Sequence, residues 1–259
     1  IWKLQKTLVP ELAGQLPETL GRDQLMLVGG VGREEAYRQA HAPQDAERLE
    51  AARRRLKFEE LFFIQMGLLR QKQLVQRTTR GNVFGQVGDH LNTFYSDHLP
   101  FTLTGAQKRV VKEIRKDMGS GRQMNRMLQG DVGSGKTLVG LLSMLIALDN
   151  GFQSALMAPT EILAQQHFAT LTTMLNDMPV AVRLLTGSTK AGERRSILAA
   201  LKAGEVHIIV GTHALLEDRV VFHRLGLVVI DEQHRFGVAQ RARMWAKSTV
   251  PPHVLVMTA

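Results

Sequence analysis

The chain has 259 residues, of which 44% are hydrophobic and 22% are charged, as in ordinary globular proteins. This length is enough for one large domain or one and a half typical ones. The chain contains no cysteine, which excludes a disulfide framework and any zinc or iron–sulfur site built on cysteine. No apolar run reaches the length of a membrane span, so we expect no contact with a membrane interior.

The net charge of +9 is unevenly distributed along the chain. Residues 1–97 hold 14 basic against 12 acidic residues, and residues 98–259 hold 19 against 12. The basic excess suits a polyanion such as nucleic acid, although a solvated basic surface explains it equally well. The chain begins at Ile1 with no apolar core of a signal peptide, so we expect a segment of a longer protein.

Residues 1–97 predict a mainly helical linker region. Proline and glycine interrupt residues 1–42, which indicates short helices and loops. A long helix is predicted over about 44–77, because apolar residues recur there at helical spacing. The arginine run at 53–55 lies on this helix, and a solvated helix face is favoured over a phosphate contact. Residues 78–98 read as a polar connector. The apolar positions at helical spacing are Phe58, Leu61, Phe62 and Leu69.

From residue 98 onward, short apolar runs alternate with helical stretches. The predicted helices cover 104–118, 136–149, 160–175 and 190–203, and the apolar runs are 127–128, 154–157, 180–182, 206–210, 225–230 and 254–257. This alternation predicts an α/β fold with a parallel sheet covered by helices on both faces. Ligands in such sheets bind at the carboxyl ends of the strands.

The segment GDVGSGKT matches the phosphate-binding pattern GxxxxGK[ST] and stands between an apolar strand and an apolar helix. Its glycines allow backbone N–H groups to turn inward, and the helix N-terminus adds partial positive charge. Lys136 can reach the β- and γ-phosphates of ATP, and Thr137 can ligate Mg²⁺. The strand–helix context favours this interpretation over a glycine-rich turn without a ligand. The predicted nucleotide-binding residues are Gly130, Asp131, Val132, Gly133, Ser134, Gly135, Lys136 and Thr137.

A second candidate site follows the apolar run 227–230, where Asp231 and Glu232 stand at the end of a predicted strand. Asp231 is predicted to hold Mg²⁺ through its water shell. Glu232 is predicted to orient or deprotonate the water that attacks ATP. An apolar run followed by Asp-Glu can also be an ordinary strand end with a helix cap. The phosphate-binding pattern upstream favours the catalytic interpretation.

Together with Gln233 and His234, the acidic pair reads DEQH, which resembles motif II of superfamily 2 helicases. Other helicase-like segments follow in order: FTLTGAQ, APTEILAQQH, the pair TG, VGTHALL and MTA, at 101–107, 158–167, 186–187, 210–216 and 257–259. The combination is most similar to the RecG family of bacterial branch-migration helicases, strongly over 99–259. RLKFEEL at 55–61 resembles the helix that precedes the motor in that family.

The resemblance implies a RecA-like ATP-binding lobe over 98–259 that stops at the start of motif III. It implies a cytoplasmic bacterial motor, monomeric, that hydrolyses ATP with Mg²⁺ to move on duplex DNA. Such motors unwind and re-pair forks and Holliday-type junctions in recombination and repair. Gln107 would contact the adenine base. Gln233, His234 and Thr258 would couple the ATP site to the DNA-binding side. The implied contacts to the DNA backbone are Thr160, Gln165, Gly187, Thr212 and His213.

Plainer readings of these residues stay open: Thr160 can simply cap its helix, and His213 can be a structural turn residue. The transcription–repair coupling factor has a related lobe, but it usually carries a bulkier residue at the position of Ser134 and reads DEEH. A nucleotide-gated DNA-binding module is another alternative. A P-loop kinase or metabolic enzyme is disfavoured, because helicase-like segments occupy the place of its basic lid.

The family's strand-separating β-barrel and its second lobe have no counterpart in these 259 residues. The second lobe carries an arginine that stabilises transition-state charge, and such an arginine contributes about 10³–10⁵ in rate. We therefore expect the 259 residues alone to bind nucleotide, to hydrolyse it very slowly and not to unwind DNA.

Overall fold

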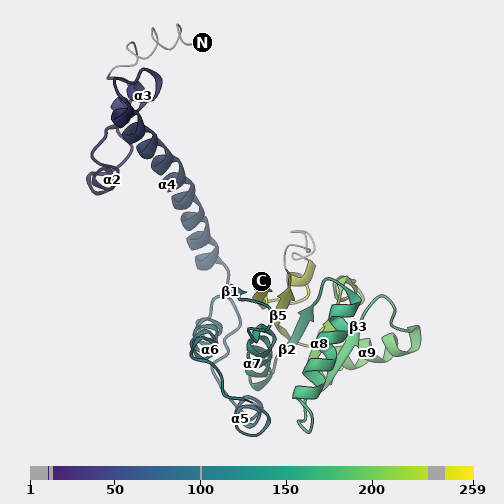
Figure 1. Ribbon diagram of the computed structural model, residues 1–259. Helices are drawn as coiled ribbons and strands as arrows, with labels where there is room; N and C mark the ends of the chain where they lie inside the picture. Colours follow the sequence, from purple (N-terminus) through teal and green to yellow (C-terminus); the bar gives the residue numbers. More distant parts are fainter. Residues whose placement is uncertain (1–10, 12–13, 100, 233–242) are drawn as a thin grey trace. The chain divides into compact units, whose positions relative to one another are not determined.

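A computed structural model of the chain describes residues 11, 14–99, 101–232 and 243–259. The chain forms two compact units, Ile1–Val75 and Gln76–Ala259, and each is described by itself (Figure 1). No helix in the described part of the chain is long and apolar enough to cross a membrane.

The first unit is helical, as predicted. It contains α2 (Arg22–Leu27), α3 (Arg33–His41) and most of α4 (Ala46–Thr78), the long helix expected over about 44–77. Along the second half of α4 most apolar residues are exposed, including Leu61 at 64% and Leu69 at 53%. Helical spacing therefore predicted the helix itself, but these positions do not form a buried stripe.

A buried ionic cluster holds the first unit together. Arg55 of α4 has no exposed surface and forms ion pairs with Glu18 and Glu59. Glu59 also accepts a hydrogen bond from the Thr19 hydroxyl at 2.5 Å. For Arg55, the expectation of a solvated or phosphate-binding arginine is therefore wrong, whereas Arg53 is exposed. Three consecutive arginines look alike in sequence, and only packing against residues 18–19 singles out the third.

Arg55→Ala should destabilise the first unit by about 3 kcal/mol, because it removes the buried cation from the mostly buried Glu59 carboxylate and leaves it only the more distant Arg33 at 3.6 Å. Hydrogen exchange of the amides in α3 and α4 measures this change directly. Arg53→Ala removes an exposed arginine from the same run and should change exchange little. Equal effects of the two substitutions would contradict the assigned role of Arg55.

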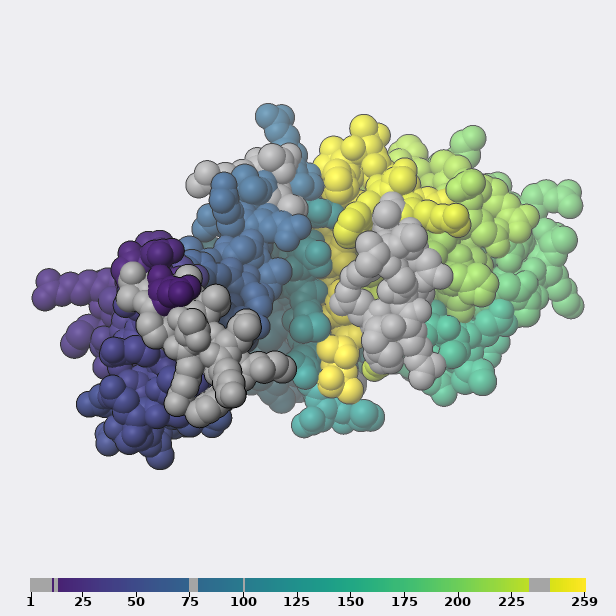
Figure 2. All heavy atoms as spheres, turned by 90° about the horizontal axis from the view of Figure 1, so that it is seen from above, coloured from purple at the N-terminus to yellow at the C-terminus, as the bar shows by residue number. Residues whose placement is uncertain are grey.

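The second unit is built on a six-stranded sheet whose paired strands are all parallel, in the order β1-β6-β5-β2-β4-β3. The α/β fold with a parallel sheet is confirmed. The space-filling view shows residues from the C-terminal end of the chain, in yellow, beside teal and yellow-green regions of this unit (Figure 2). The strands are β1 Asn125–Gln129, β2 Gln153–Met157, β3 Val182–Leu185, β4 Ile208–Gly211, β5 Leu225–Asp231 and β6 His253–Thr258.

The four predicted helices of this unit are all present, and the short elements α5 and η1 before them and η2 after them are additional. The helical elements are α5 Asp89–Thr93, the π-helical turn η1 Phe94–His98, α6 Gly105–Met118, α7 Lys136–Asp149, α8 Glu161–Met174, α9 Ala191–Ala203 and the 3₁₀ turn η2 His213–Leu216. The strand expected at 180–182 begins only at Val182. One reason is that the Ala181 amide donates to the His207 side chain instead of a strand neighbour.

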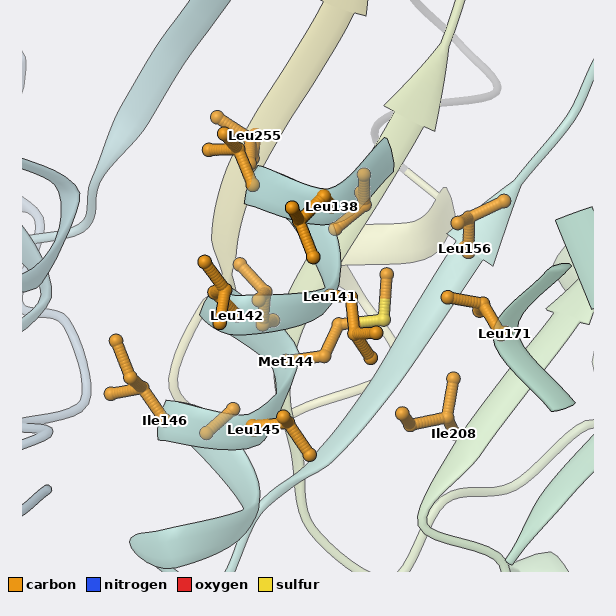
Figure 3. Packing of buried hydrophobic residues seen from close by; sticks show 14 of the residues in the cluster. Leu138, Leu141, Leu142, Met144, Leu145, Ile146, Leu156, Leu171, Ile208 and Leu255 are labelled. Carbon is orange, nitrogen blue, oxygen red and sulfur yellow. The ribbon is translucent and has the colours of Figure 1, made fainter. Parts of the chain in front are cut away.

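Both faces of the sheet are covered by apolar side chains. One cluster combines α6, α7 and α8 with side chains such as Leu156 and Leu255, and the other packs α9 and η2 against side chains such as Ile209 and Val228. Helix α7 is buried at every position from Leu138 to Ala147, which explains its nearly uninterrupted apolar sequence. Figure 3 shows its leucines pointing toward the surrounding strands and helices.

Residues 79–98 belong to this unit, so they are more than the polar connector expected from their composition. Phe84 and Phe94 are both buried in the core. At the end of α7, the Asp149 carboxylate accepts hydrogen bonds from the amides of Gly88, His90 and Leu91 at the start of α5. The few aromatic residues of this polar segment, Phe84, Phe94 and Tyr95, form no periodic pattern by which this packing could be predicted.

A buried histidine joins β6 to the neighbouring segments. The Nδ1 atom of His253 accepts from the Met124 amide at 2.9 Å, and Nε2 donates to the Asn82 carbonyl at 2.9 Å. The ring also packs edge-on against Phe84, with centroids 4.7 Å apart. Burial lowers the pKa of His253 from 6.5 to about 4, so the folded chain keeps this ring neutral.

Lowering the pH from 7 to 5 should reduce the free energy of unfolding of this unit by about 2 kcal/mol through His253. Below about pH 6.5 the unfolded chain is protonated at His253, whereas the folded chain is protonated there only below about pH 4. Urea unfolding at several pH values checks this, and His253→Gln should flatten the slope. Part of the remaining dependence of the unfolding free energy on pH should come from His207, whose pKa is also lowered by burial. An unchanged slope in the variant would contradict the assignment.

Candidate nucleotide site and nucleic-acid interface

The phosphate-binding pattern forms a turn between β1 and α7. Gly133 and Gly135 both have left-handed backbone conformations, with φ values of 82° and 81°. Gly135 directly precedes α7, so the turn delivers the chain to a helix N-terminus whose first N–H groups have no partner within the helix. A Cβ atom on Gly135 would lie 2.4 Å from the side-chain nitrogen of Gln107. The backbone angle therefore favours glycine there, and a Cβ would also push the end of the Gln107 side chain aside.

Lys136 directs its ammonium group into this turn. The group donates to the carbonyl oxygens of Gly130 and Asp131, the latter at 2.9 Å. The positive charge therefore lies beside the backbone that the pattern predicts to surround phosphate oxygens. Val132, also in the turn, is 93% exposed and packs against nothing in the described part of the chain.

Gln107 joins the start of α6 to the phosphate-binding turn. Its side-chain oxygen accepts from the Thr104 amide, and the Thr104 hydroxyl accepts from the Gln107 amide, which completes a capping box. The side-chain nitrogen of Gln107 donates to the Ser134 carbonyl at 3.0 Å. This places Gln107 beside the GDVGSGKT turn, and its contact with adenine stays a prediction.

The acidic pair lies at the carboxyl end of β5. Asp231 is the last residue of the strand, and its carboxylate contacts the Nε2 atom of His167 at 2.7 Å. Glu232 follows with φ 53°, a left-handed conformation that is uncommon for a residue with a side chain. Its amide donates to the Met257 carbonyl at 2.9 Å. Backbone strain of this kind concentrates at functional sites.

Strand β6 lies between the two candidate motifs and contacts both through its backbone. The Thr258 carbonyl accepts from the Gly130 amide at 3.3 Å, and the preceding carbonyl accepts from Glu232. Thr258, predicted to couple the nucleotide and DNA sites, therefore stands next to the first residue of the phosphate-binding turn. The other two predicted coupling residues, Gln233 and His234, lie outside the described residues.

The donor atoms fit a magnesium ion that is held mainly by phosphate and water. Thr137 offers a hydroxyl oxygen and Asp231 a carboxylate, both hard ligands suited to Mg²⁺. β1 and β5 are two strand positions apart, so their ends lie about 10 Å from each other. Among the described residues no three His, Cys, Asp or Glu side chains gather as a metal site. A protein cage is not what such nucleotide sites require, because Mg²⁺ keeps several waters.

The residues predicted to contact DNA follow the other three strands. Thr160 follows β2, Gly187 follows β3, and Thr212 follows β4, so all three lie at the same edge of the sheet. The Thr160 hydroxyl caps α8 by accepting from the Leu163 amide at 3.3 Å, as its plainer reading anticipated. Gln165, Gly187 and His213 are exposed. Thr212 is buried, which leaves its side chain away from the surface.

Two residues that the sequence analysis did not single out hold the loop after β3. The Glu161 carboxylate accepts from the amide and the hydroxyl of Ser188, at 3.2 and 2.7 Å. The Ser188 hydroxyl is the main cause that lowers the pKa of Glu161. Arg194 donates to the Thr186 carbonyl at 2.6 Å and pairs with Glu217 at 3.0 Å. Glu161 was visible only as an acid in a helical first turn, and nothing local indicated its partner.

The class of protein follows from this arrangement and from one family model. The model for DEAD/DEAH box helicases matches residues 104–259, which is more than half of the chain. The chain therefore belongs to the DEAD/DEAH box helicase family.

Within that family, the chain is a homologue of RecG. It is 48% identical over 254 residues to the ATP-dependent DNA helicase RecG of Synechocystis sp., covering 98% of this chain and 30% of the relative. It is 45% identical over 225 residues to RecG of Bacillus subtilis, covering 87% of this chain and 33% of the relative.

A solved structure of RecG bound to a three-way DNA junction has the same fold. It is 40% identical, with a TM-score of 0.78, and the match covers 98% of this chain and 34% of that one. The chain thus spans about a third of the length of the proteins it matches.

Gly135→Ala should weaken the binding of an ATP analogue about 5- to 30-fold. The left-handed conformation costs a residue with a Cβ about 1–2 kcal/mol, and the new methyl group would displace Gln107 from Ser134. Gly192→Ala is a matched control, because a Cβ there meets no atom within 4 Å. Fluorescence titration of both variants tests the point. Unchanged affinity in Gly135→Ala would mean that this turn does not surround the nucleotide.

Proposed function

We propose that this chain is the ATP-binding lobe of a bacterial, cytoplasmic and monomeric DNA motor that translocates on duplex DNA. The motor would remodel branched DNA, such as forks and Holliday-type junctions, in recombination and repair. The observation that carries the proposal is the placement of GDVGSGKT and Asp231-Glu232 at the ends of β1 and β5, with β6 bonded to both. The RecG homologue bound to a three-way junction supports branched DNA as the substrate.

In the proposed nucleotide site, each residue has a distinct part. The N–H groups of the turn and the start of α7 would hold the phosphates, with Lys136 balancing their charge. Thr137 and Asp231 would hold Mg²⁺, which neutralises negative charge on the phosphate oxygens. Glu232 would orient and deprotonate the attacking water. Gln107, fixed against the turn by Ser134, would face the adenine base.

The proposed DNA surface is the other half of the same sheet edge. Thr160, Gln165, Gly187 and His213 would contact phosphate and sugar, which positions the motor without reading sequence. Thr212 is buried, so it would take part through its backbone rather than its hydroxyl. The excess of basic residues over 98–259 favours such a partner. Thr258, Gln233 and His234 would relay changes between the two halves.

The transcription–repair coupling factor is a weaker candidate for this chain. The sequence reads DEQH rather than DEEH and carries Ser134 where that factor has a bulkier residue. The identity of 48% with a RecG helicase over nearly the whole chain agrees with this preference.

Lys136→Ala should abolish Mg²⁺-dependent binding of a fluorescent ATP analogue, because it removes the cation that balances the phosphates. The measurement is a titration with and without Mg²⁺. Lys202→Ala, an exposed lysine of α9, serves as the matched control and should bind as the unchanged chain does. Binding that is indifferent to Lys136 or to Mg²⁺ would overturn the proposed nucleotide site.

A further inference from the structure

A histidine outside the predicted site contacts the proposed magnesium ligand. The Nε2 atom of His167 lies 2.7 Å from Oδ2 of Asp231, although the two residues are 64 positions apart in the chain. Their side chains are only 13% and 14% exposed. An ionised carboxylate can only accept a hydrogen bond, so Nε2 carries the hydrogen. His167 therefore donates a hydrogen bond to Asp231, and both side chains are largely shielded from solvent.

His167 lies on a helix that contacts both halves of the sheet edge. His167 lies on α8, which follows β2, whereas Asp231 ends the neighbouring strand β5. β5 belongs to the proposed nucleotide half of the sheet edge and β2 to the proposed DNA half, so the boundary between the halves runs between these two strands. The first turn of α8 carries Glu161, which holds the loop after β3 through Ser188. Six residues of helix, about 9 Å, therefore separate the two contacts that α8 makes with the two halves.

We propose that His167 is a positioning residue that orients the Asp231 carboxylate for Mg²⁺. A carboxylate that binds a metal is commonly fixed by a hydrogen bond to one oxygen, which leaves the other directed at the ion or its water. Here His167 occupies Oδ2 and leaves Oδ1 for the Mg²⁺ side. This inference rests on the function proposed above for Asp231. It adds that α8, which Thr160 caps and which bears Gln165, sets the geometry of the metal ligand.

The test is a titration of Mg²⁺ into the chain with a fluorescent ATP analogue present, followed by binding and by thermal midpoint. His167→Ala should raise the Mg²⁺ concentration at half-saturation about 10–100-fold, the usual effect of losing such a partner. Nucleotide binding without Mg²⁺ should stay unchanged. His167→Gln retains a side-chain N–H donor and should recover much of the Mg²⁺ affinity. Gln166→Ala, an exposed neighbour on α8, is the matched control.

Asp231→Asn separates failure of this inference from failure of the proposed function. A shifted Mg²⁺ requirement in Asp231→Asn but not in His167→Ala would overturn the role of His167 and leave the function of Asp231 intact. No shift in either variant would overturn both. Equal loss of binding with and without Mg²⁺ in His167→Ala would show a merely structural role. The same Mg²⁺ requirement in the Gln and Ala variants would contradict a hydrogen bond as the cause, even where Ala lowers stability.

Discussion

Parallel pairing of the sheet strands is the constraint on which the rest of the second unit depends. Every ladder in the sheet is parallel, so the carboxyl ends of all six strands meet at one edge. Each return connection must cross a face of the sheet, and apolar side chains cover both faces as a result. Motifs as far apart in sequence as Gly130 and Thr258 thereby lie along one edge of the sheet, where ligands of parallel sheets usually bind.

The order of the strands divides this edge into two halves with different proposed roles. β1, β6 and β5 end in the phosphate-binding turn, Thr258 and the acidic pair, while β2, β4 and β3 end in the segments proposed to contact DNA. The helix α8 contacts both halves, through Glu161 at its start and His167 in its second turn. A motor needs such a physical connection, because energy from ATP is useful only if the nucleotide site and the track respond to each other.

Much of this arrangement was predictable from sequence, because its determinants are local. The glycine and lysine spacing of GDVGSGKT, the apolar run before Asp231 and the period of the helices each depend on neighbours within a few residues. The features that escaped prediction depend on distant partners. Thr212 is buried by the packing around β4, Arg55 by residues 18–19, and Glu232 takes its left-handed conformation beside β6. The contact between His167 and Asp231 exists only because β2 and β5 pair.

The most direct test of this account is a map of amide hydrogen exchange in the chain with and without a Mg²⁺–ATP analogue. The account predicts that protection centres on residues 130–137, whose N–H groups would hold the phosphates, and extends to residues 231–232 and 258 across β6. Protection at these three segments of the sheet edge would place the nucleotide between β1 and β5. Protection elsewhere, with residues 130–137 exchanging as before, would contradict the assignment of the nucleotide site.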